Sequence, residues 1–282
     1  MRFIIVEGVI AAGKSALVEA IASALCAAGR DAVAVPEPVA EWEHSGLLAA
    51  FYRDPVANGL AFQLFAAATR ARAVAAAARA HPGAMFVLER SAESDRLFFE
   101  LLRRDLPPGA GLAYDSAAPL LTAGAFADAQ MKTSNLQAEI AAAPVIFLAV
   151  PPSLAAERGA ARARAAEIAP ASRDPQASAV SPGSNPGSIP GGQPGAWPGG
   201  DSPAGGVSLA YLERLARAHD AMLFGRHADE FPSLALAPDA CLGRRVIVIP
   251  DELARADFRT GGAARAAVGE WVVEQLKVMP GW

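Results

Sequence analysis

The chain has 282 residues, of which 52% are hydrophobic and 19% are charged, and its formal net charge is −4. This size and apolar content suit a single large α/β domain with a sizeable buried core. The acidic balance argues against nucleic acid or an anionic membrane as a partner, because binding either one needs a basic surface. Two cysteines, Cys26 and Cys241, cannot build a disulfide framework or a cysteine-based zinc site, so we expect a reducing, cytoplasmic location.

Short apolar runs alternate with helical patterns along the chain. Strands are predicted over residues 3–6, 32–35, 85–88, 145–150 and 246–249, and helices over residues 15–28, 60–79 and 209–224. Short buried strands separated by helices are typical of a parallel sheet with helices on both faces. We therefore predict an α/β fold with a five-stranded parallel sheet, whose ligands bind at the carboxyl ends of the strands. The longest apolar stretch, residues 140–152, is too short to span a bilayer, and Glu7 and Lys14 interrupt the apolar run that a signal peptide would need.

A segment rich in proline and glycine, residues 170–206, departs from this pattern. It contains a period of four residues that reads PGSN, PGSI, PGGQ, PGAW and PGGD. Because the segment shows no hydrophobic period, burial cannot offset the entropy cost of ordering it. We interpret it as a disordered insertion in a surface loop of one domain that spans residues 1–282. A partner-binding tract around Trp197 is the less favoured interpretation.

The most specific motif directly follows the first predicted strand. Residues 8–15 read Gly-Val-Ile-Ala-Ala-Gly-Lys-Ser, which is the phosphate-loop pattern G-x-x-x-x-G-K-[ST] between a strand and a helix. In such a loop the backbone N–H groups and the helix N-terminus face the phosphates. Lys14 would reach the β- and γ-phosphates, and the Ser15 hydroxyl would bind Mg²⁺. The pattern predicts a nucleotide-binding loop, and the alternative is an ordinary glycine turn before a helix. The residues predicted to bind the nucleotide are Gly8, Ala11, Ala12, Gly13, Lys14, Ser15 and Ala16.

Further short motifs follow the strand ends in order. They comprise Glu37, Glu41 and Trp42 after the second strand, Phe62, Gln63 and Arg70 on the long helix, Glu89, Arg90, Ser91, Ser94, Asp95 and Arg96 after the third strand, and Glu157, Arg158, Arg162, Arg164 and Glu167 after the fourth. Together with the phosphate loop, their order and spacing resemble the deoxynucleoside kinase family, most of all its deoxycytidine/deoxyguanosine kinase branch. The resemblance runs from residue 3 to residue 167 and resumes near Val207, with Leu209, Tyr211, Leu212 and Glu213.

This resemblance implies a P-loop kinase fold with an arginine-rich lid. It implies transfer of the γ-phosphoryl group of ATP, with Mg²⁺, to the 5′-hydroxyl of a deoxynucleoside, and hence a role in nucleotide salvage. It also implies a homodimer. Three positions differ from the family pattern: Val9 stands where an asparagine is usual, Ala16 where a threonine is usual, and Ala166 where the lid usually has a glutamate.

The resemblance also assigns roles at the acceptor site. Glu37 matches the general base for the 5′-hydroxyl, which suits a carboxylate just past a strand end, although a surface glutamate in a proline-bounded loop is the alternative. Glu89 would hold Mg²⁺ and Arg90 would steady the base and the 5′-oxygen, whereas the alternative for both is a strand-terminal ion pair. The remaining substrate-binding matches are Tyr52 and Glu167 for the sugar 3′-hydroxyl, and Trp42 and Phe62 for the base pocket.

The residues expected to recognise the nucleobase lie on the long predicted helix and in the segment after the third strand. Gln63 and Arg70 are seven residues apart, so they share one helical face, and an amide can read a base edge. By resemblance, Arg70 pairs with Asp95 and shapes the site for cytosine or a purine. The alternative for Arg70 is a solvated helix face. The four histidines, His44, His81, His219 and His227, show no metal-ligand spacing and are interpreted as structural or surface residues.

Arg158 and Arg162 are four residues apart, hence on one helical stripe, and Arg164 follows. They resemble the lid arginines that close over the transferred phosphoryl group, where developing negative charge calls for cations. A solvated helix with Glu157 and Glu167 as partners is the alternative.

Other functions stay open at this point. A thymidine-preferring or broad kinase would share these motifs. A nucleoside monophosphate kinase shares the fold, but it needs cations for the phosphate of its acceptor, whereas Glu37, Tyr52 and Glu167 suit a nucleoside. A P-loop subunit that binds nucleotide without transferring phosphate is the alternative from another class, against which the intact Lys14 and Ser15 argue.

Overall fold

The computed structural model describes residues 2–128, 133–162, 207–234, 245–256, 262–279 and 282. The predicted insertion at residues 170–206 lies outside these residues, as do Arg164 and Glu167. Within the described part of the chain, no helix is long and apolar enough to cross a membrane.

A five-stranded parallel sheet forms the centre of the molecule, as predicted. Its strands are β1 (Phe3–Glu7), β2 (Ala32–Val35), β3 (Met85–Glu89), β4 (Val145–Phe147) and β5 (Val246–Val248), in the order β2-β3-β1-β4-β5. The prediction that the fourth strand reaches residue 150 is wrong, because the backbone turns so that the Val150 N–H donates to the Leu148 carbonyl at 2.9 Å. The first and third strands are each one residue longer than predicted and end on buried acids, Glu7 and Glu89.

Helices cover both faces of the sheet. The long helix α4 (Pro55–Ala80) begins five residues earlier than predicted, since Asp54 caps it by accepting from the Ala57 N–H at 2.9 Å and Pro55 stands in its first turn. Helix α10 (Leu209–Phe224) has the predicted bounds, with Ser208 as its N-cap and Gly225 as its C-cap. The other helices are α1 (Lys14–Ala27), α2 (Val39–His44), α3 (Leu47–Arg53), α5 (Ala92–Leu102), α6 (Ala110–Asp128), α7 (Thr133–Ala141), α8 (Pro152–Arg162), α12 (Asp251–Ala254) and α13 (Gly262–Lys277).

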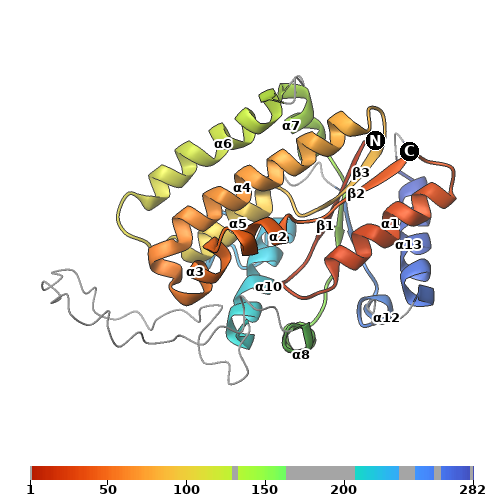
Figure 1. Ribbon diagram of the computed structural model, residues 1–282. Coiled ribbons are helices and arrows are strands. Elements are labelled where there is room, and N and C mark those ends of the chain that lie inside the picture. Colours follow the sequence, from red (N-terminus) through yellow and green to blue (C-terminus); the bar gives the residue numbers. More distant parts are fainter. Residues whose placement is uncertain (1, 129–132, 163–206, 235–244, 257–261, 280–281) are drawn as a thin grey trace, which may run out of the picture.

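Alternate residues of the strands enter two different cores. Ile4 and Val6 of β1 pack with α1, α10 and α13, whereas Phe3 and Ile5 pack with α4, α6 and α7. Figure 1 shows α4 and α6 side by side on one side of the sheet and α1 and α13 on the other. A third apolar cluster surrounds Trp42 and contains, among the described residues, none from a strand. Most of its residues come from α2, α3, α4, α5 and α6. This cluster provides an apolar wall next to the carboxyl ends of the strands.

Candidate active site

A cavity of about 250 Å³ lies where the phosphate loop, the ends of β2 and β3, and helices α2, α3, α4, α8 and α10 meet. It brings together most of the residues predicted from the motifs: Ala11, Gly13, Lys14, Ser15, Ala16, Glu37, Trp42, Tyr52, Phe62, Gln63, Arg70, Glu89, Arg90, Asp95, Arg158 and Arg162. The predicted nucleotide-binding residues Gly8 and Ala12 do not line it. The convergence of motifs from distant parts of the chain indicates one functional site.

The phosphate loop has the backbone shape that its glycines permit. Gly13 has a φ of 106° and caps α1, which therefore begins at Lys14 with its N-terminal N–H groups toward the loop. Gly8 has a φ of 152°, and a Cβ there would lie 2.8 Å from the Leu148 carbonyl oxygen, so this glycine serves close packing against the chain after β4. The Lys14 ammonium donates to the Val9 carbonyl at 2.9 Å.

Burial and the nearby Arg90 lower the pKa of Lys14 to about 7, against the opposing effect of Glu89, Glu37 and Glu7. Burial thus disfavours the charged form of Lys14, and the negative charge of a bound phosphate would stabilise it. Ser15 and Glu89, which also line the cavity, offer a hydroxyl and a carboxylate oxygen. Among the described residues no group of three or more His, Cys, Asp or Glu could hold a metal. This donor set fits Mg²⁺, which is commonly bound through one or two protein oxygens together with substrate phosphates.

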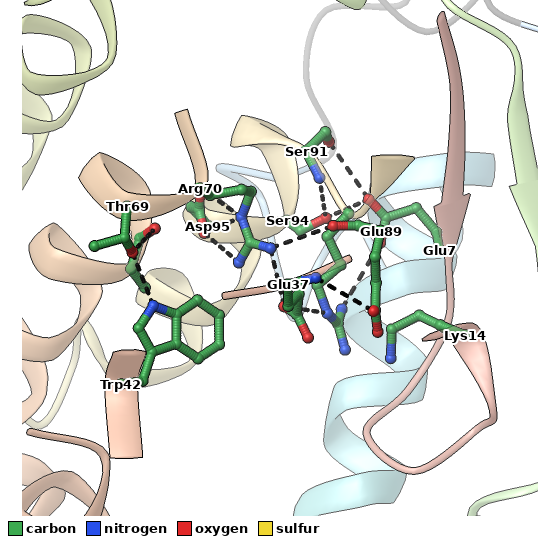
Figure 2. A network of polar contacts seen from close by, with 12 residues as sticks. Glu7, Lys14, Glu37, Trp42, Thr69, Arg70, Glu89, Ser91, Ser94 and Asp95 are labelled. Carbon is green, nitrogen blue, oxygen red and sulfur yellow. Dashed lines mark hydrogen bonds and ion pairs between the residues drawn. The ribbon is translucent and has the colours of Figure 1, made fainter. Parts of the chain in front are cut away.

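Glu37 lies at the centre of the charged residues, two positions after β2 ends. Its Oε1 accepts from Arg70 Nη1 at 2.9 Å and forms an ion pair with Arg90, whose Nε lies 3.1 Å away. The Glu37 N–H donates to Glu89 Oε2 at 3.4 Å (Figure 2). Burial alone would raise the pKa of Glu37, but Arg90, Arg70 and Lys14 outweigh burial and lower the pKa to about 2. The Glu37 side chain, 15% exposed, is therefore a carboxylate at neutral pH.

Protein stability should depend on pH through this carboxylate. The Glu37 pKa is about 2 in the folded protein and near the ordinary 4.5 in the unfolded chain, so its stabilising effect is present above pH 4.5 and is lost as the pH falls toward 2. In denaturant unfolding, we expect the wild type to be more stable than Glu37→Gln at neutral pH. The difference should shrink below pH 4.5, since a protonated glutamate resembles glutamine. A difference that is independent of pH would contradict this assignment.

The predicted pair between Arg70 of α4 and Asp95 of α5 is present. Arg70 Nε and Nη2 lie 3.1 and 2.9 Å from Asp95 Oδ1, and the two side chains are 8% and 5% exposed. Asp95 and Glu37 hold the pKa of Arg70 above its ordinary range, although burial opposes them. The motifs did not indicate that Arg70 also binds Glu37. One guanidinium therefore connects Asp95 of α5 with Glu37, the carboxylate that follows β2.

The apolar wall of the cavity is aromatic. The rings of Trp42 and Phe62 meet edge to face with centroids 5.7 Å apart, and Phe51 stacks on Phe62 at 4.9 Å. Trp42 Nε1 donates to Thr69 Oγ1 at 2.8 Å, which fixes the indole in place (Figure 2). A planar ring could be held against this wall. Gln63, buried on the same helix as Phe62, supplies an amide beside it.

Arg90 is held in an unusual backbone conformation. Its φ is 68°, in the left-handed region, which costs about 1–3 kcal/mol for a residue other than glycine. Its N–H donates to the Val6 carbonyl at 3.0 Å, and its guanidinium lies 4.6 Å from the centroid of the Phe98 ring. Such strain at a buried arginine in a cavity indicates a functional constraint. Phe98, which also lines the cavity, was missed by the motifs, and Tyr211, which lies in the motif after Leu209, was given no role there.

Arg158 of α8 is bound to backbone carbonyls. Its Nη1 donates to Ala12 at 2.8 Å, and its Nη2 contacts the carbonyls of Ala254, Arg255 and Ala256 at 3.0 to 3.3 Å. It thereby ties α8 to both the phosphate loop and the C-terminal end of α12. Arg162, one turn further along α8, also lines the cavity. The prediction that these two residues share a helical stripe is confirmed.

A family model described as deoxynucleoside kinase matches residues 4–170. The chain belongs to the deoxynucleoside kinase family. Membership implies a kinase that phosphorylates deoxynucleosides with ATP, and the α/β sheet has the P-loop kinase arrangement predicted from the sequence. The matched region of this deoxynucleoside kinase includes every residue that lines the cavity except Tyr211. A comparison with curated proteins gives no match.

Proposed function

We propose that this kinase transfers the γ-phosphoryl group of ATP to the 5′-hydroxyl of deoxycytidine or a purine deoxynucleoside, in nucleotide salvage. The observation that carries the proposal is the position of Glu37. This ionised carboxylate lies between the aromatic wall, where a base fits, and the Lys14 end of the phosphate loop. An acceptor hydroxyl placed between the two would face a proton acceptor on one side and the transferred phosphoryl group on the other.

In the proposed reaction, the 5′-oxygen forms a bond to the γ-phosphorus while the bond from that phosphorus to the leaving ADP oxygen breaks. Glu37 orients the hydroxyl and takes its proton. Because the pKa of Glu37 is low, this transfer completes only as the 5′-oxygen loses electron density to phosphorus. Lys14, Arg162 and, outside the described residues, Arg164 would stabilise charge on the phosphoryl oxygens. Mg²⁺, held by Ser15 and Glu89, would neutralise the β- and γ-phosphates when bound.

For the nucleoside, we propose that Trp42 and Phe62 hold the base, while Gln63 and the Arg70–Asp95 pair read its edge. Hydrogen-bond donors from Gln63 and Arg70 suit the ring nitrogen and carbonyl acceptors of cytosine or a purine. Tyr52 lies in the cavity where a sugar would be held, and we assign it to the 3′-hydroxyl together with Glu167, which lies outside the described residues.

The cations around the acceptor position favour a nucleoside over a nucleoside monophosphate. Arg70 and Arg90 both pair with carboxylates, so neither is set up to hold the phosphate of an acceptor. We expect ATP to phosphorylate deoxynucleosides and not deoxynucleoside monophosphates, as read from ADP release with each acceptor supplied separately. Turnover on monophosphates alone would support a nucleoside monophosphate kinase. ATP binding without turnover on any acceptor would support a subunit that only binds nucleotide.

The hydrogen bonds of Arg158 to backbone carbonyls predict that its substitution changes the kinetics differently from substitution of Arg162. Lysine at position 158 keeps the charge but cannot reach both the phosphate loop and the carbonyls near α12. We expect Arg158→Lys to raise the KM for ATP about 10-fold with a smaller fall in kcat, and Arg162→Lys to lower kcat more than it raises KM. Steady-state kinetics with varied ATP tests both variants. If both variants lower kcat equally and leave the KM for ATP unchanged, Arg158 acts on the transferred phosphoryl group in the same way as Arg162.

The homodimer and the cytoplasmic location stay predictions. Helix α6 exposes Leu112, Leu120 and Leu121, whose relative exposures are 75%, 73% and 40%, and a cluster of exposed leucines on one helix supports contact with a second copy. Light scattering of the purified protein would measure the oligomeric state directly, and a monomer at micromolar concentration would contradict the proposed homodimer.

A further inference from the structure

A fully buried polar cluster adjoins Arg90 but does not line the cavity. It consists of Glu7 at the end of β1, His219 on α10, and Ser91 and Ser94 at the start of α5. Glu7 is 1% exposed and His219 is 0% exposed. The proposed chemistry gives none of these four residues a role, although burying a carboxylate this deeply is costly unless it is paired.

Glu7 contacts two serines, His219 and Arg90. Glu7 Oε1 accepts from the hydroxyls of Ser94 and, at 3.4 Å, of Ser91 (Figure 2). Glu7 Oε2 lies 3.7 Å from Arg90 Nη1 and 3.7 Å from His219 Nε2. On its other side, Arg90 Nε forms an ion pair with Glu37 Oε1 at 3.1 Å. The Arg90 guanidinium therefore spans two carboxylates, one inside the cavity and one behind it.

His219 is itself held in place. Its Nδ1 lies 2.8 Å from the Leu215 carbonyl, which can only accept, so Nδ1 carries a proton and Nε2 is the atom that faces Glu7. The imidazole also stacks against Phe147 of β4, with centroids 5.8 Å apart. Burial alone would raise the pKa of Glu7, but His219, Arg90 and Ser94 outweigh burial and lower it, so Glu7 stays a carboxylate. Glu7 is thus a buried carboxylate beside Arg90, with one of its oxygens bound by two serine hydroxyls.

We propose that Glu7, held by the hydroxyls of Ser91 and Ser94, is a positioning residue that keeps Arg90 Nη1 on its own side, so that Nε is the guanidinium atom closest to Glu37. This inference rests on the proposed function of Glu37. Without the Glu7 charge, Arg90 has Glu37 as its remaining close carboxylate partner, and arginine favours two parallel hydrogen bonds to one carboxylate. Such a bidentate pair would occupy the carboxylate oxygens that the 5′-hydroxyl needs. Glu7 therefore keeps one oxygen of Glu37 available to the acceptor.

The test is Glu7→Gln, with Glu100→Gln as the matched control. Glu100 is a buried glutamate that also pairs with an arginine, since it accepts from Arg103 Nε at 2.9 Å, and it does not line the cavity. We expect Glu7→Gln to lower kcat at least ~10-fold, and Glu100→Gln to leave kcat within about two-fold of the wild type. The KM for ATP should change little in both variants. A folded Glu7→Gln protein with the wild-type kcat would overturn the proposal.

A double-mutant cycle separates positioning from a general loss of stability. Because Glu7 acts through Arg90, adding Glu7→Gln to an Arg90→Lys protein should cause little further fall in kcat, whereas independent effects would multiply and overturn the proposal. If Glu7→Gln does not fold, Ser94→Ala serves in its place. That variant removes one hydrogen bond to Glu7 and should lower kcat about three-fold in the wild type but not in Arg90→Lys.

A readout without turnover distinguishes this inference from the proposed function. The Arg90 Nε–H resonance in ¹⁵N NMR is assigned by its disappearance in Arg90→Lys. It should shift in Glu7→Gln and keep its position in Glu100→Gln, while an unchanged resonance in Glu7→Gln would overturn the positioning role. A wild-type protein that is inactive on every deoxynucleoside would refute the proposed function instead, and the resonance would still decide whether Glu7 positions Arg90.

Discussion

Replacing Glu37 by glutamine should lower kcat at least about 100-fold while changing the KM for the nucleoside little. Glutamine keeps the size of the side chain, but it cannot take the proton of the 5′-hydroxyl. It also leaves Arg70 and Arg90 without the carboxylate that they share, which adds to the loss. Steady-state kinetics with saturating ATP and varied deoxynucleoside measure both constants.

Glu41→Gln is the matched control for this substitution. Glu41 lies four residues along the chain on α2, and its partner, Arg72, is exposed on α4. This variant should keep kcat within about two-fold of the wild type, because exposed ion pairs contribute little. A Glu37→Gln protein with near-normal kcat would exclude Glu37 as the base.

The second large effect is expected at Arg70. Arg70→Met removes the counter-ion that Glu37 and Asp95 share, which leaves two buried carboxylates close together. Breaking a buried pair in this way is strongly unfavourable, so kcat/KM should fall at least about 100-fold for every deoxynucleoside. Arg72→Met, on the same helix and exposed, should leave kcat/KM nearly unchanged.

Removing Asp95 together with Arg70 should reverse part of this loss. In Arg70→Met with Asp95→Ala, the Asp95 carboxylate that loses its ion pair with Arg70 is absent as well, and Glu37 keeps Arg90 as its partner. The smaller, apolar side chains also give room to the 5-methyl group of thymine, so preference should move toward thymidine. The ratio of kcat/KM for thymidine to that for deoxycytidine measures this shift. A double variant that is no more active than Arg70→Met would show that the charge balance is not the reason for the loss.

The sequence predicts many of the residues that line the cavity, because several of these residues follow the strand ends. Glu37 comes two residues after one short apolar run and Glu89 ends another, and in a parallel sheet these ends meet at one edge. The pattern from Gly8 to Ser15 needs no tertiary information, since the loop, the glycines and the helix start are all local. The same holds for α10, whose N-cap and C-cap residues can be read from the sequence.

Contacts between distant segments could not be predicted in this way. The motifs gave Arg70 one partner, Asp95, whereas the fold gives it a second in Glu37, 33 residues away. Glu7 and His219 carry no motif signal, because a single glutamate in an apolar run and a single histidine on a helix have many ordinary roles. Helix α6 was missed because its many alanines give it almost no hydrophobic period.

The most direct measurement of the central claim is the kcat/KM of the wild-type protein for all four deoxynucleosides with ATP and Mg²⁺, with the product identified as a 5′-monophosphate. The site around Glu37, Gln63 and the Arg70–Asp95 pair predicts that deoxycytidine or a purine deoxynucleoside has the highest value and that thymidine has a lower one. A highest value for thymidine would contradict the assignment of the base-reading pair. Phosphorylation of none of the four would contradict the proposed kinase reaction itself.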